Sequence, residues 1–276
     1  MNRRGQVRIA MVGCGHMGSA IVSRWLATGT VTSAHVRACT ARSASANALQ
    51  ERFGFAAGTN LADAVVGADV VVLGFKPQVR GDIVPHLGAV LAGDRPLVIS
   101  LMAGVGLDEL RASLGPRLAR WMPNTPVATG AGIVGQSAHG LGQGDLEVLA
   151  CLADPLGVRV DVGEGQFDAL TAVAGCGPAY VFAFCEALTA AGQAQGLDRA
   201  MAEQLAKQVV IGAGHLLAGS AEDASELRRR VTSKGGMTEA ALAKLQQCAW
   251  AEALLDAVGA AVERGQQLAQ PVEPAR

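Results

Sequence analysis

Charged residues are scarce in this chain, and their signs almost cancel. Of its 276 residues, 23 are Lys or Arg and 24 are Asp or Glu, which gives a formal net charge of −1 at pH 7. Binding to nucleic acid depends on an excess of basic side chains, so this balance predicts no nucleic-acid partner. The short basic run 228–230 is interpreted as a solvated helix face. Because 50% of the residues are hydrophobic, a disordered chain is excluded and a compact enzyme is favoured.

Patterns that bind metals or build disulfide frameworks are missing as well. The six cysteines include no C-x-x-C pair, and the five histidines form no H-E-x-x-H motif. We therefore predict no metal site, and scattered cysteines with apolar neighbours indicate a reducing cytoplasm. Residues 1–6 are polar and lead directly into an apolar strand, so no secretory signal is indicated.

One apolar stretch, 170–188, has the length of a membrane span. It carries no charge before Glu186, but Gly175, Gly177 and Pro178 interrupt it, and its alanines contribute little transfer free energy. We expect a helix buried in a core or in a subunit interface, with no membrane partner. A membrane span is the alternative.

The first half begins with a motif for dinucleotide binding. An apolar strand predicted over 7–12 runs directly into a G-x-G-x-x-G sequence made by Gly13, Gly15 and Gly18, and a helix is predicted to about Ala27. The first glycine permits a tight turn, the second lets the backbone approach a pyrophosphate, and the third allows the helix to pack closely. A purely structural glycine-rich turn is the alternative.

The end of the second predicted strand, 34–40, bears on the choice of cofactor. A site for NADH usually has an acidic residue there for the ribose 2′-hydroxyl, but this chain has Arg42 and Ser43. A guanidinium and a hydroxyl are suited to a 2′-phosphate. We therefore predict NADPH as the cofactor, with NADH as a weaker alternative. A solvated arginine at a strand end is the other interpretation of Arg42.

The rest of the first half alternates apolar strands with helical segments. Strands are predicted at 70–75, 96–101, 118–121 and 158–162, and the two prolines within 122–126 predict a stiff extended loop. This alternation indicates an α/β fold with a Rossmann-type doubly wound parallel sheet over 1–162. Because ligands bind at the carboxyl ends of such strands, Lys76 and the loop at Ala103 are expected near the cofactor.

After Gly163 the pattern becomes helical. Long apolar helices are predicted over 164–195, 198–217 and 238–268, and residues 163–276 are therefore expected to form a second, all-helical domain for dimerisation and substrate binding. Such helices expose more apolar surface than a small domain can leave in water. A homodimer is the smallest expected assembly, and assemblies of several dimers are possible.

Residues 231–238 have the composition of an anion pocket. Gly235 and Gly236 let the backbone turn so that several N–H groups point inward, and Thr238 is predicted to cap the helix that follows. The N-terminus of a helix attracts a carboxylate or a phosphate. An ordinary capped turn is the alternative.

Taken together, these motifs resemble those of the pyrroline-5-carboxylate reductase family, and the resemblance spans nearly the whole chain. The last motif, V-T-S-x-G-G-x-T continued through Leu245 and Gln246, is the family signature. The segments that carry the resemblance are 13–18, 75–78, 122–126, 177–180 and 231–238.

The resemblance implies a function and a set of site residues. It implies NADPH-dependent reduction of 1-pyrroline-5-carboxylate to L-proline, the last step of proline biosynthesis, with Thr238 as the catalytic residue that hydrogen-bonds the ring nitrogen. The implied substrate-binding residues are Ser233, Gly235, Gly236, Met237 and Thr238. The implied cofactor-binding residues are Gly13, Gly15, His16, Met17, Gly18, Arg42, Ser43, Asn60, Lys76, Pro77 and Ala103.

Three positions depart from the family pattern and keep alternatives open. Lys234 replaces the usual proline, and Ala174 and Cys176 replace serines. A reductase of a related cyclic imino acid is therefore a second candidate. A hydroxyacid-dehydrogenase-like oxidoreductase would need a lysine or histidine in the central helix, and none lies between Gly175 and Ala191. A cofactor-binding protein without turnover is disfavoured by the intact glycine motif of 231–238.

Overall fold

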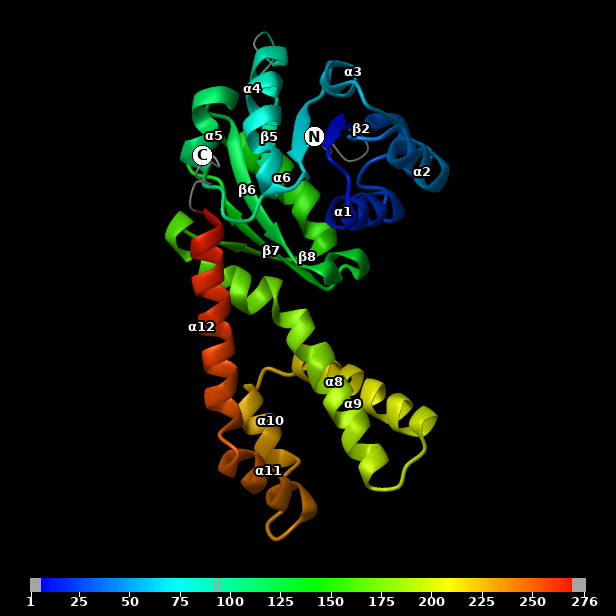
Figure 1. The fold of residues 1–276 in the computed structure, drawn as a ribbon, viewed down its shortest axis with the longest axis vertical. Helices are drawn as coiled ribbons and strands as arrows, with labels where there is room; N and C mark the ends of the chain where they lie inside the picture. The colour runs from blue at the N-terminus through cyan, green and yellow to red at the C-terminus, as the bar shows by residue number, and fades with distance from the viewer. Residues whose placement is uncertain (1–5, 92, 94, 270–276) are drawn as a thin grey trace, which may run out of the picture. The chain divides into compact units, whose positions relative to one another are not determined.

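The structure, a computed structural model, describes residues 6–91, 93 and 95–269 (Figure 1). Contacts between residues divide the chain into two compact units. One contains the described parts of Met1–Gly175 and Val262–Arg276, and the other is Cys176–Ala261.

The first unit is built on a single sheet, which has eight strands in the described part of the chain and the order β3-β2-β1-β4-β5-β6-β7-β8. The strands β1 to β6 run parallel in the order 3-2-1-4-5-6 of a doubly wound fold, as the sequence predicts. β3 and β7 were not predicted, and β7 runs antiparallel to β6. The strands are β1 (Ile9–Val12), β2 (Val36–Cys39), β3 (Ala56–Gly58), β4 (Val70–Leu73), β5 (Leu97–Ser100), β6 (Leu118–Pro123), β7 (Gly132–Ser137) and β8 (Gly157–Asp161).

Helices cover both faces of this sheet, because successive strand residues point to opposite faces. In β1, Ile9 and Met11 belong to one core and Ala10 and Val12 to the other. Helices α1 (His16–Ala27), α2 (Ser43–Phe53) and α6 (Gln143–Ala153) pack into the first core. Helices α3 (Leu61–Val65), α4 (Arg80–Val90) and α5 (Leu107–Leu114) pack into the second.

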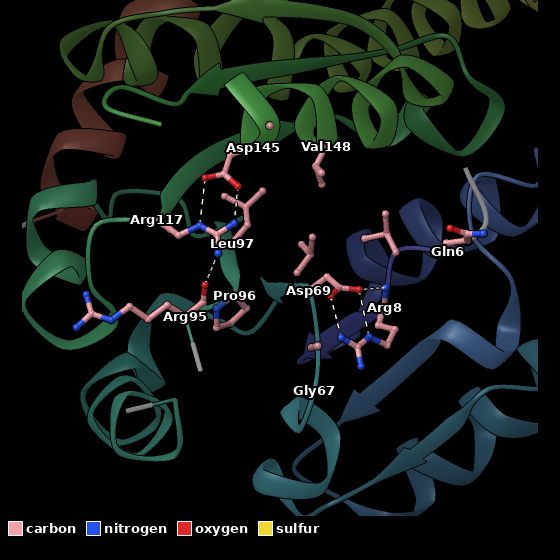
Figure 2. A pocket seen from close by; sticks show the side chains of 14 residues that line it. Gln6, Arg8, Gly67, Asp69, Arg95, Pro96, Leu97, Arg117, Asp145 and Val148 are labelled. Atoms are coloured by element: carbon pink, nitrogen blue, oxygen red, sulfur yellow. Dashed lines mark hydrogen bonds and ion pairs between the residues drawn. The ribbon is translucent and has the colours of Figure 1, made fainter. Parts of the chain in front are cut away.

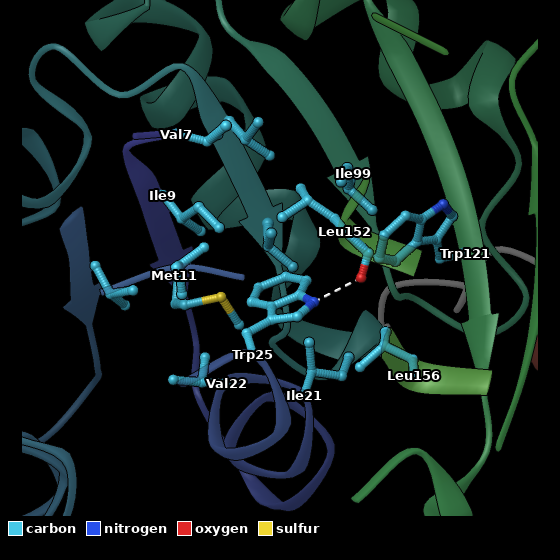
Figure 3. Packing of buried hydrophobic residues seen from close by; sticks show 14 of the residues in the cluster. Val7, Ile9, Met11, Ile21, Val22, Trp25, Ile99, Trp121, Leu152 and Leu156 are labelled. Carbon is cyan, nitrogen blue, oxygen red and sulfur yellow. Dashed lines mark hydrogen bonds between the residues drawn. The ribbon is translucent and has the colours of Figure 1, made fainter. Parts of the chain in front are cut away.

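The first core is centred on Trp25 of α1. Figure 3 shows its ring beside Met11 of β1 and Ile21 of the same helix. The indole nitrogen Nε1 is buried and donates a hydrogen bond of 2.6 Å to the carbonyl of Leu152 in α6. The hydrogen bond removes the cost of burying a polar group, and it ties the glycine-loop helix α1 to α6, which packs into the same core.

One local prediction in this unit is wrong, and one strand is shorter than predicted. The proline segment 122–126 is not an extended loop, because β6 continues to Pro123 and a 3₁₀ helix, Thr125–Thr129, follows. Pro126 lies in the first turn of this helix, where a missing N–H is tolerated. β2 also begins later than predicted, because Ser33–His35 forms a 3₁₀ turn before it.

The predicted continuous helix over 164–195 is also wrong. The chain forms a 3₁₀ turn (Glu164–Gln166), α7 (Phe167–Leu170), a π-helix (Thr171–Gly175) and α8 (Gly177–Ala194). Two side chains of the sheet unit bind the first part of this interrupted segment, Arg120 at its start and Asn124 near its end. Arg120 lies 4.0 Å from the ring of Phe167 and donates to the carboxylate of Glu164 at 2.9 Å, and Asn124 donates to the carbonyl of Ala174 at 3.0 Å. These contacts hold 164–174 against the sheet, which is why this segment belongs to the first unit.

The second unit is helical. It contains α8, α9 (Arg199–Gly219), α10 (Ala224–Arg230), α11 (Met237–Gln247) and the first part of α12 (Trp250–Ala269), which continues into the first unit. The predicted single helix over 238–268 is wrong, because the chain turns at Ala249, whose φ is 52°. The basic run Arg228–Arg230 forms the exposed last turn of α10, as expected.

Large apolar side chains remain exposed on the helices of this unit. Phe182 and Phe184 of α8 are 62% and 55% exposed, and Leu216 of α9 is 63% exposed. By length and composition, one helical stretch among the described residues, Glu164–Ala194, could cross a membrane, with a mean hydropathy of 1.3 and 11% of its most apolar window buried. The stretch is not buried within its own chain, so of the two expected locations, a core or a subunit interface, the interface is the one that would cover its apolar side chains.

Candidate cofactor and substrate sites

A cavity of about 750 Å³ opens at the carboxyl ends of β1, β2 and β4. The residues predicted for the cofactor that line it are Gly13, Gly15, Asn60 and Lys76. Other residues, none of which was predicted to bind the cofactor, complete the wall of the cavity; they include Thr40, Ser45, Thr59, Phe75, Val79, Asp82, Ile83 and His86.

The glycine loop forms one wall of this cavity, and its backbone needs glycine. Gly13 has a φ of 80°, and a Cβ there would lie 2.7 Å from the backbone nitrogen of Phe75. A Cβ on Gly15 would meet nothing within 4 Å, so the backbone is open to the cavity at that point. Gly15 is also the N-cap of α1 and provides no side-chain hydrogen bond to the first turn. The N–H groups of His16 and Met17 are thus free to bind an anion, which fits a pyrophosphate.

Gly18 has the packing role that the sequence predicts. It is buried in the first turns of α1, and a Cβ there would lie 3.2 Å from Cε of Met11. Cys14, between the first two glycines, also lines the cavity. Burial raises the pKa of the Cys14 thiol above its usual value, although a hydrogen bond to Ser19 and the charge of Arg52 act in the opposite direction. The thiol therefore stays neutral near pH 7 and brings no negative charge to a pyrophosphate.

The residues proposed for the 2′-phosphate lie beyond β2. Arg42 is the N-cap of α2, and its exposed side chain makes no hydrogen bond or ion pair with another described residue. Ser43 is the first residue of α2, and neither residue lines the cavity. Ser45, two positions on, does line it. The serine-rich start of α2 was the signal that could have identified Ser45.

Asn60 and Lys76 close the cavity on the other side. The side-chain oxygen of Asn60 caps α3 by accepting a hydrogen bond of 3.0 Å from the N–H of Ala62, which leaves its amide NH₂ group available to a ligand. Lys76 is the N-cap of the 3₁₀ turn Pro77–Val79. Pro77 and Ala103 lie outside the cavity lining, and Ala103 is in the exposed turn after β5.

A second hollow lies at the opposite ends of the strands and differs in character. It has a volume of about 600 Å³ and is lined by residues that precede β1, β4, β5 and β6. Figure 2 shows two ion pairs in its lining, Arg8 with Asp69 on one side and Arg117 with Asp145 on the other. The four charges of these pairs neutralise each other.

The predicted anion pocket forms a turn and a helix start in the second unit. α11 begins at Met237 with Gly236 as its N-cap, so the prediction that Thr238 caps the helix is wrong. Thr238 is instead the second helical residue. Gly235 has a φ of 75°, and a Cβ on Gly236 would clash with Oγ of Ser233 and lie 3.0 Å from its carbonyl oxygen. Both glycines are thus required by the turn, for different reasons.

Part of this turn is already hydrogen-bonded and part is free. The N–H of Gly236 donates to the carbonyl of Ser233 at 3.0 Å, and the N–H of Gly235 donates to the Glu239 carboxylate at 2.7 Å. The first backbone bond of the helix is donated by Ala240, so the N–H groups of 237–239 have no partner within the helix. Within the described residues, the hydroxyls of Ser233 and Thr238 have no hydrogen-bond partner either. The turn can therefore offer a carboxylate both backbone and hydroxyl donors.

No group of three or more His, Cys, Asp and Glu side chains that could hold a metal ion occurs among the residues that the structure describes.

A doubly wound sheet with an open glycine loop beside a cavity at its strand ends defines a Rossmann-type dinucleotide-binding protein. Two protein-family models match the chain, one in each half. The model of NADP oxidoreductase, coenzyme F420-dependent, matches residues 8–104, and that of pyrroline-5-carboxylate reductase dimerisation matches 164–268.

Relatives with established names match nearly the full chain. A pyrroline-5-carboxylate reductase of Pseudomonas aeruginosa is 36% identical, covering 95% of this chain and 97% of its own length. That of Synechocystis is 33% identical, covering 95% and 98%. The chain therefore belongs to the pyrroline-5-carboxylate reductase family.

Solved structures of the same family share the fold. The pyrroline-5-carboxylate reductase of Coxiella burnetii has a TM-score of 0.88 at 30% identity, covering 97% of this chain and 100% of its own. The Plasmodium falciparum enzyme, solved with NADP bound, has a TM-score of 0.86 at 23% identity, with the same coverage. The match of the dimerisation model to 164–268 accounts for the exposed apolar helices without a membrane.

Proposed function

We propose that this protein reduces 1-pyrroline-5-carboxylate to L-proline with NADPH, the last step of proline biosynthesis. The observation that carries the proposal is the turn at 233–238, which presents unpaired N–H groups and the free hydroxyls of Ser233 and Thr238 at the start of α11. The names of the relatives support the same reaction.

The chemistry asks for positioning more than for acid or base strength. When bound, the cofactor supplies a hydride to the imine carbon. A protonated cyclic imine is already electrophilic, so the chain has to hold it in register and exclude water. In the proposal, the backbone donors of Gly235, Gly236 and Met237, with Ser233, hold the carboxylate. Thr238 is the catalytic residue and orients the ring nitrogen through its hydroxyl.

The two glycine donors are not equally available. The N–H of Gly236 is used within the turn and that of Gly235 by Glu239, so these two contribute only if the carboxylate displaces or shares those bonds. Met237 and Thr238 have the freer N–H groups. The larger share of the carboxylate binding is therefore assigned to the first turn of α11.

For the cofactor, the proposed contacts follow the cavity and the glycine loop. The pyrophosphate is assigned to the glycine loop and the start of α1, and the 2′-phosphate to the start of α2. The rest of the cofactor is assigned to the cavity wall that contains Asn60 and Lys76 and to the turn after β5. The proposed residues are Gly13, Gly15, His16, Met17, Gly18, Arg42, Ser43, Asn60, Lys76, Pro77 and Ala103.

Replacing Arg42 by alanine is expected to raise the KM for NADPH by about ten-fold and to leave the KM for NADH within about two-fold, because only NADPH carries the 2′-phosphate. Arg42 is exposed at a helix start and has no partner among the described residues, so its removal should not disturb the fold. Steady-state kinetics with both cofactors measure the difference. Equal losses with NADPH and NADH would remove Arg42 from the phosphate site.

We further propose that residues 163–276 carry dimerisation and the substrate turn, and that 1–162 carry the cofactor. A homodimer, or an assembly of dimers, covers the apolar side chains that one chain leaves exposed on α8 and α9. A cytoplasmic location is proposed from the scattered, unpaired cysteines.

The test is an assay of NADPH oxidation with a panel of cyclic imino acids. The five-membered substrate 1-pyrroline-5-carboxylate is expected to give the highest kcat/KM, with its six-membered homologue lower. A higher kcat/KM for the homologue would make the related imino acid the substrate, and Lys234 would be the first residue to examine. Turnover of a hydroxyacid instead of any imine would contradict the proposal.

A further inference from the structure

The turn that is proposed to bind the substrate already contains a carboxylate of its own. Oε2 of Glu239 accepts a hydrogen bond of 2.7 Å from the N–H of Gly235, four residues earlier. Glu239 is the third residue of α11, after Met237 and Thr238, so its side chain reaches back over the helix N-terminus. A glutamate at this position commonly makes such a contact, and it stabilises a helix start.

The consequence here is electrostatic. The helix N-terminus and its free N–H groups attract negative charge, and the Glu239 carboxylate is a negative charge held at that place. A substrate carboxylate bound by the N–H groups of Met237 and Thr238 would lie within one helical turn of it, at a separation where two like charges in a partly solvated site repel noticeably. Lys234, the residue before Gly235, has no ion-pair partner among the described residues. Its positive charge can offset this repulsion.

We propose that Glu239 is a specificity-determining residue that weakens and tunes anion binding at this turn. It occupies the Gly235 N–H and keeps the charge of the site near zero together with Lys234. The inference rests on the proposed function, because the anion that it acts on is the substrate carboxylate. Glu239 therefore has two separable roles: its hydrogen bond orders the turn, and its charge lowers the affinity for an acid.

Glu239→Gln separates the two roles, since its amide oxygen can still accept from Gly235 while the charge is gone. At low ionic strength we expect the KM for 1-pyrroline-5-carboxylate to fall by about three- to ten-fold, with kcat and the KM for NADPH unchanged. In about 1 M salt, where the screening length is about 3 Å, the difference from wild type should shrink to less than about two-fold. Glu239→Ala loses the hydrogen bond as well, so its KM should lie above that of Glu239→Gln.

Glu147→Gln is the matched control. Glu147 is an exposed helical carboxylate of α6 that also accepts a hydrogen bond from four residues earlier, from Nε2 of Gln143 at 3.3 Å. Its replacement removes the same charge away from the turn, so the KM should stay at the wild-type value at both salt concentrations. A KM of Glu239→Gln equal to or above that of wild type at low salt would overturn the proposal and leave Glu239 a structural cap.

A binding measurement keeps this inference distinct from the proposed function. Acetate is titrated into the wild type and Glu239→Gln at low salt, and the amide ¹⁵N–¹H shifts of Met237 and Thr238 are followed. Acetate should bind the variant about three- to ten-fold more tightly, whatever imine the enzyme reduces. Equal affinities would overturn the role of Glu239, whereas a wild type without turnover of 1-pyrroline-5-carboxylate would contradict only the proposed function.

Discussion

Replacing Gly236 by valine is expected to lower kcat/KM for 1-pyrroline-5-carboxylate by at least about 100-fold, mainly through KM. The cause is steric. A Cβ at this position would overlap Oγ of Ser233 and lie 3.0 Å from the Ser233 carbonyl, so the turn that aims the donors must open. Backbone strain is not the reason, because Gly236 has a φ of −86° in the extended region that any residue adopts. NADPH affinity, measured by fluorescence titration, should stay within about two-fold.

Gly144→Val is the control for this substitution. Gly144 lies in the first turn of α6, as Gly236 lies at the start of α11, but a Cβ there would meet nothing within 4 Å. Activity should therefore be retained. Circular dichroism and light scattering of both variants separate a damaged site from a misfolded chain. A Gly236→Val enzyme with wild-type KM and kcat would show that the turn does not bind the substrate.

Replacing Thr238 by alanine is expected to lower kcat by about ten-fold or more, which is roughly the effect of losing one hydrogen bond that strengthens in the transition state. Thr238 is the second residue of α11 and has no hydrogen bond from its hydroxyl to another described residue, so no structural bond is lost. Alanine is also a good helix former. The KM for NADPH should barely change.

Thr238→Ser restores the hydroxyl without the methyl group and should recover most of the turnover. This pattern, with loss in alanine and recovery in serine, distinguishes orientation of the ring nitrogen from a general effect of the side chain on the helix. Unchanged turnover and substrate affinity in Thr238→Ala would mean that the motif is only a helix start. The catalytic assignment would then have to be abandoned.

The sheet could be predicted from the sequence because its determinants are local. Strands such as Val70–Leu73 are short apolar runs, and Gly13, Gly15 and Gly18 mark the first turn wherever the fold is used. The helical half was predicted less well. Its break at 171–175 lies where Asn124 of the sheet unit donates a hydrogen bond to the carbonyl of Ala174, a tertiary contact that no local pattern signals. Its break at Ala249 requires a positive φ at a residue other than glycine, which the local pattern does not signal either.

The candidate sites divide in the same way. Gly13, Gly15 and Lys76 line the cavity as the sequence predicts, because each follows a predicted strand. Asn60, which only the family resemblance implied, lines it as well. Asp82 and His86 line it too, but they come from the first two turns of α4, and only the packing of that helix on the sheet brings them there. The bond from Gly235 to Glu239 was likewise outside what the sequence predicts, because it depends on how the side chain folds back.

The most direct measurement of the central claim is isotope transfer. The enzyme is given NADPH carrying deuterium at the transferred position of C4, together with 1-pyrroline-5-carboxylate, and the product is examined by mass spectrometry and NMR. The account predicts L-proline with one deuterium on the δ-carbon, the former imine carbon, formed in equal amount to the NADPH consumed. Proline without the label, or consumption of NADPH with no proline formed, would contradict it.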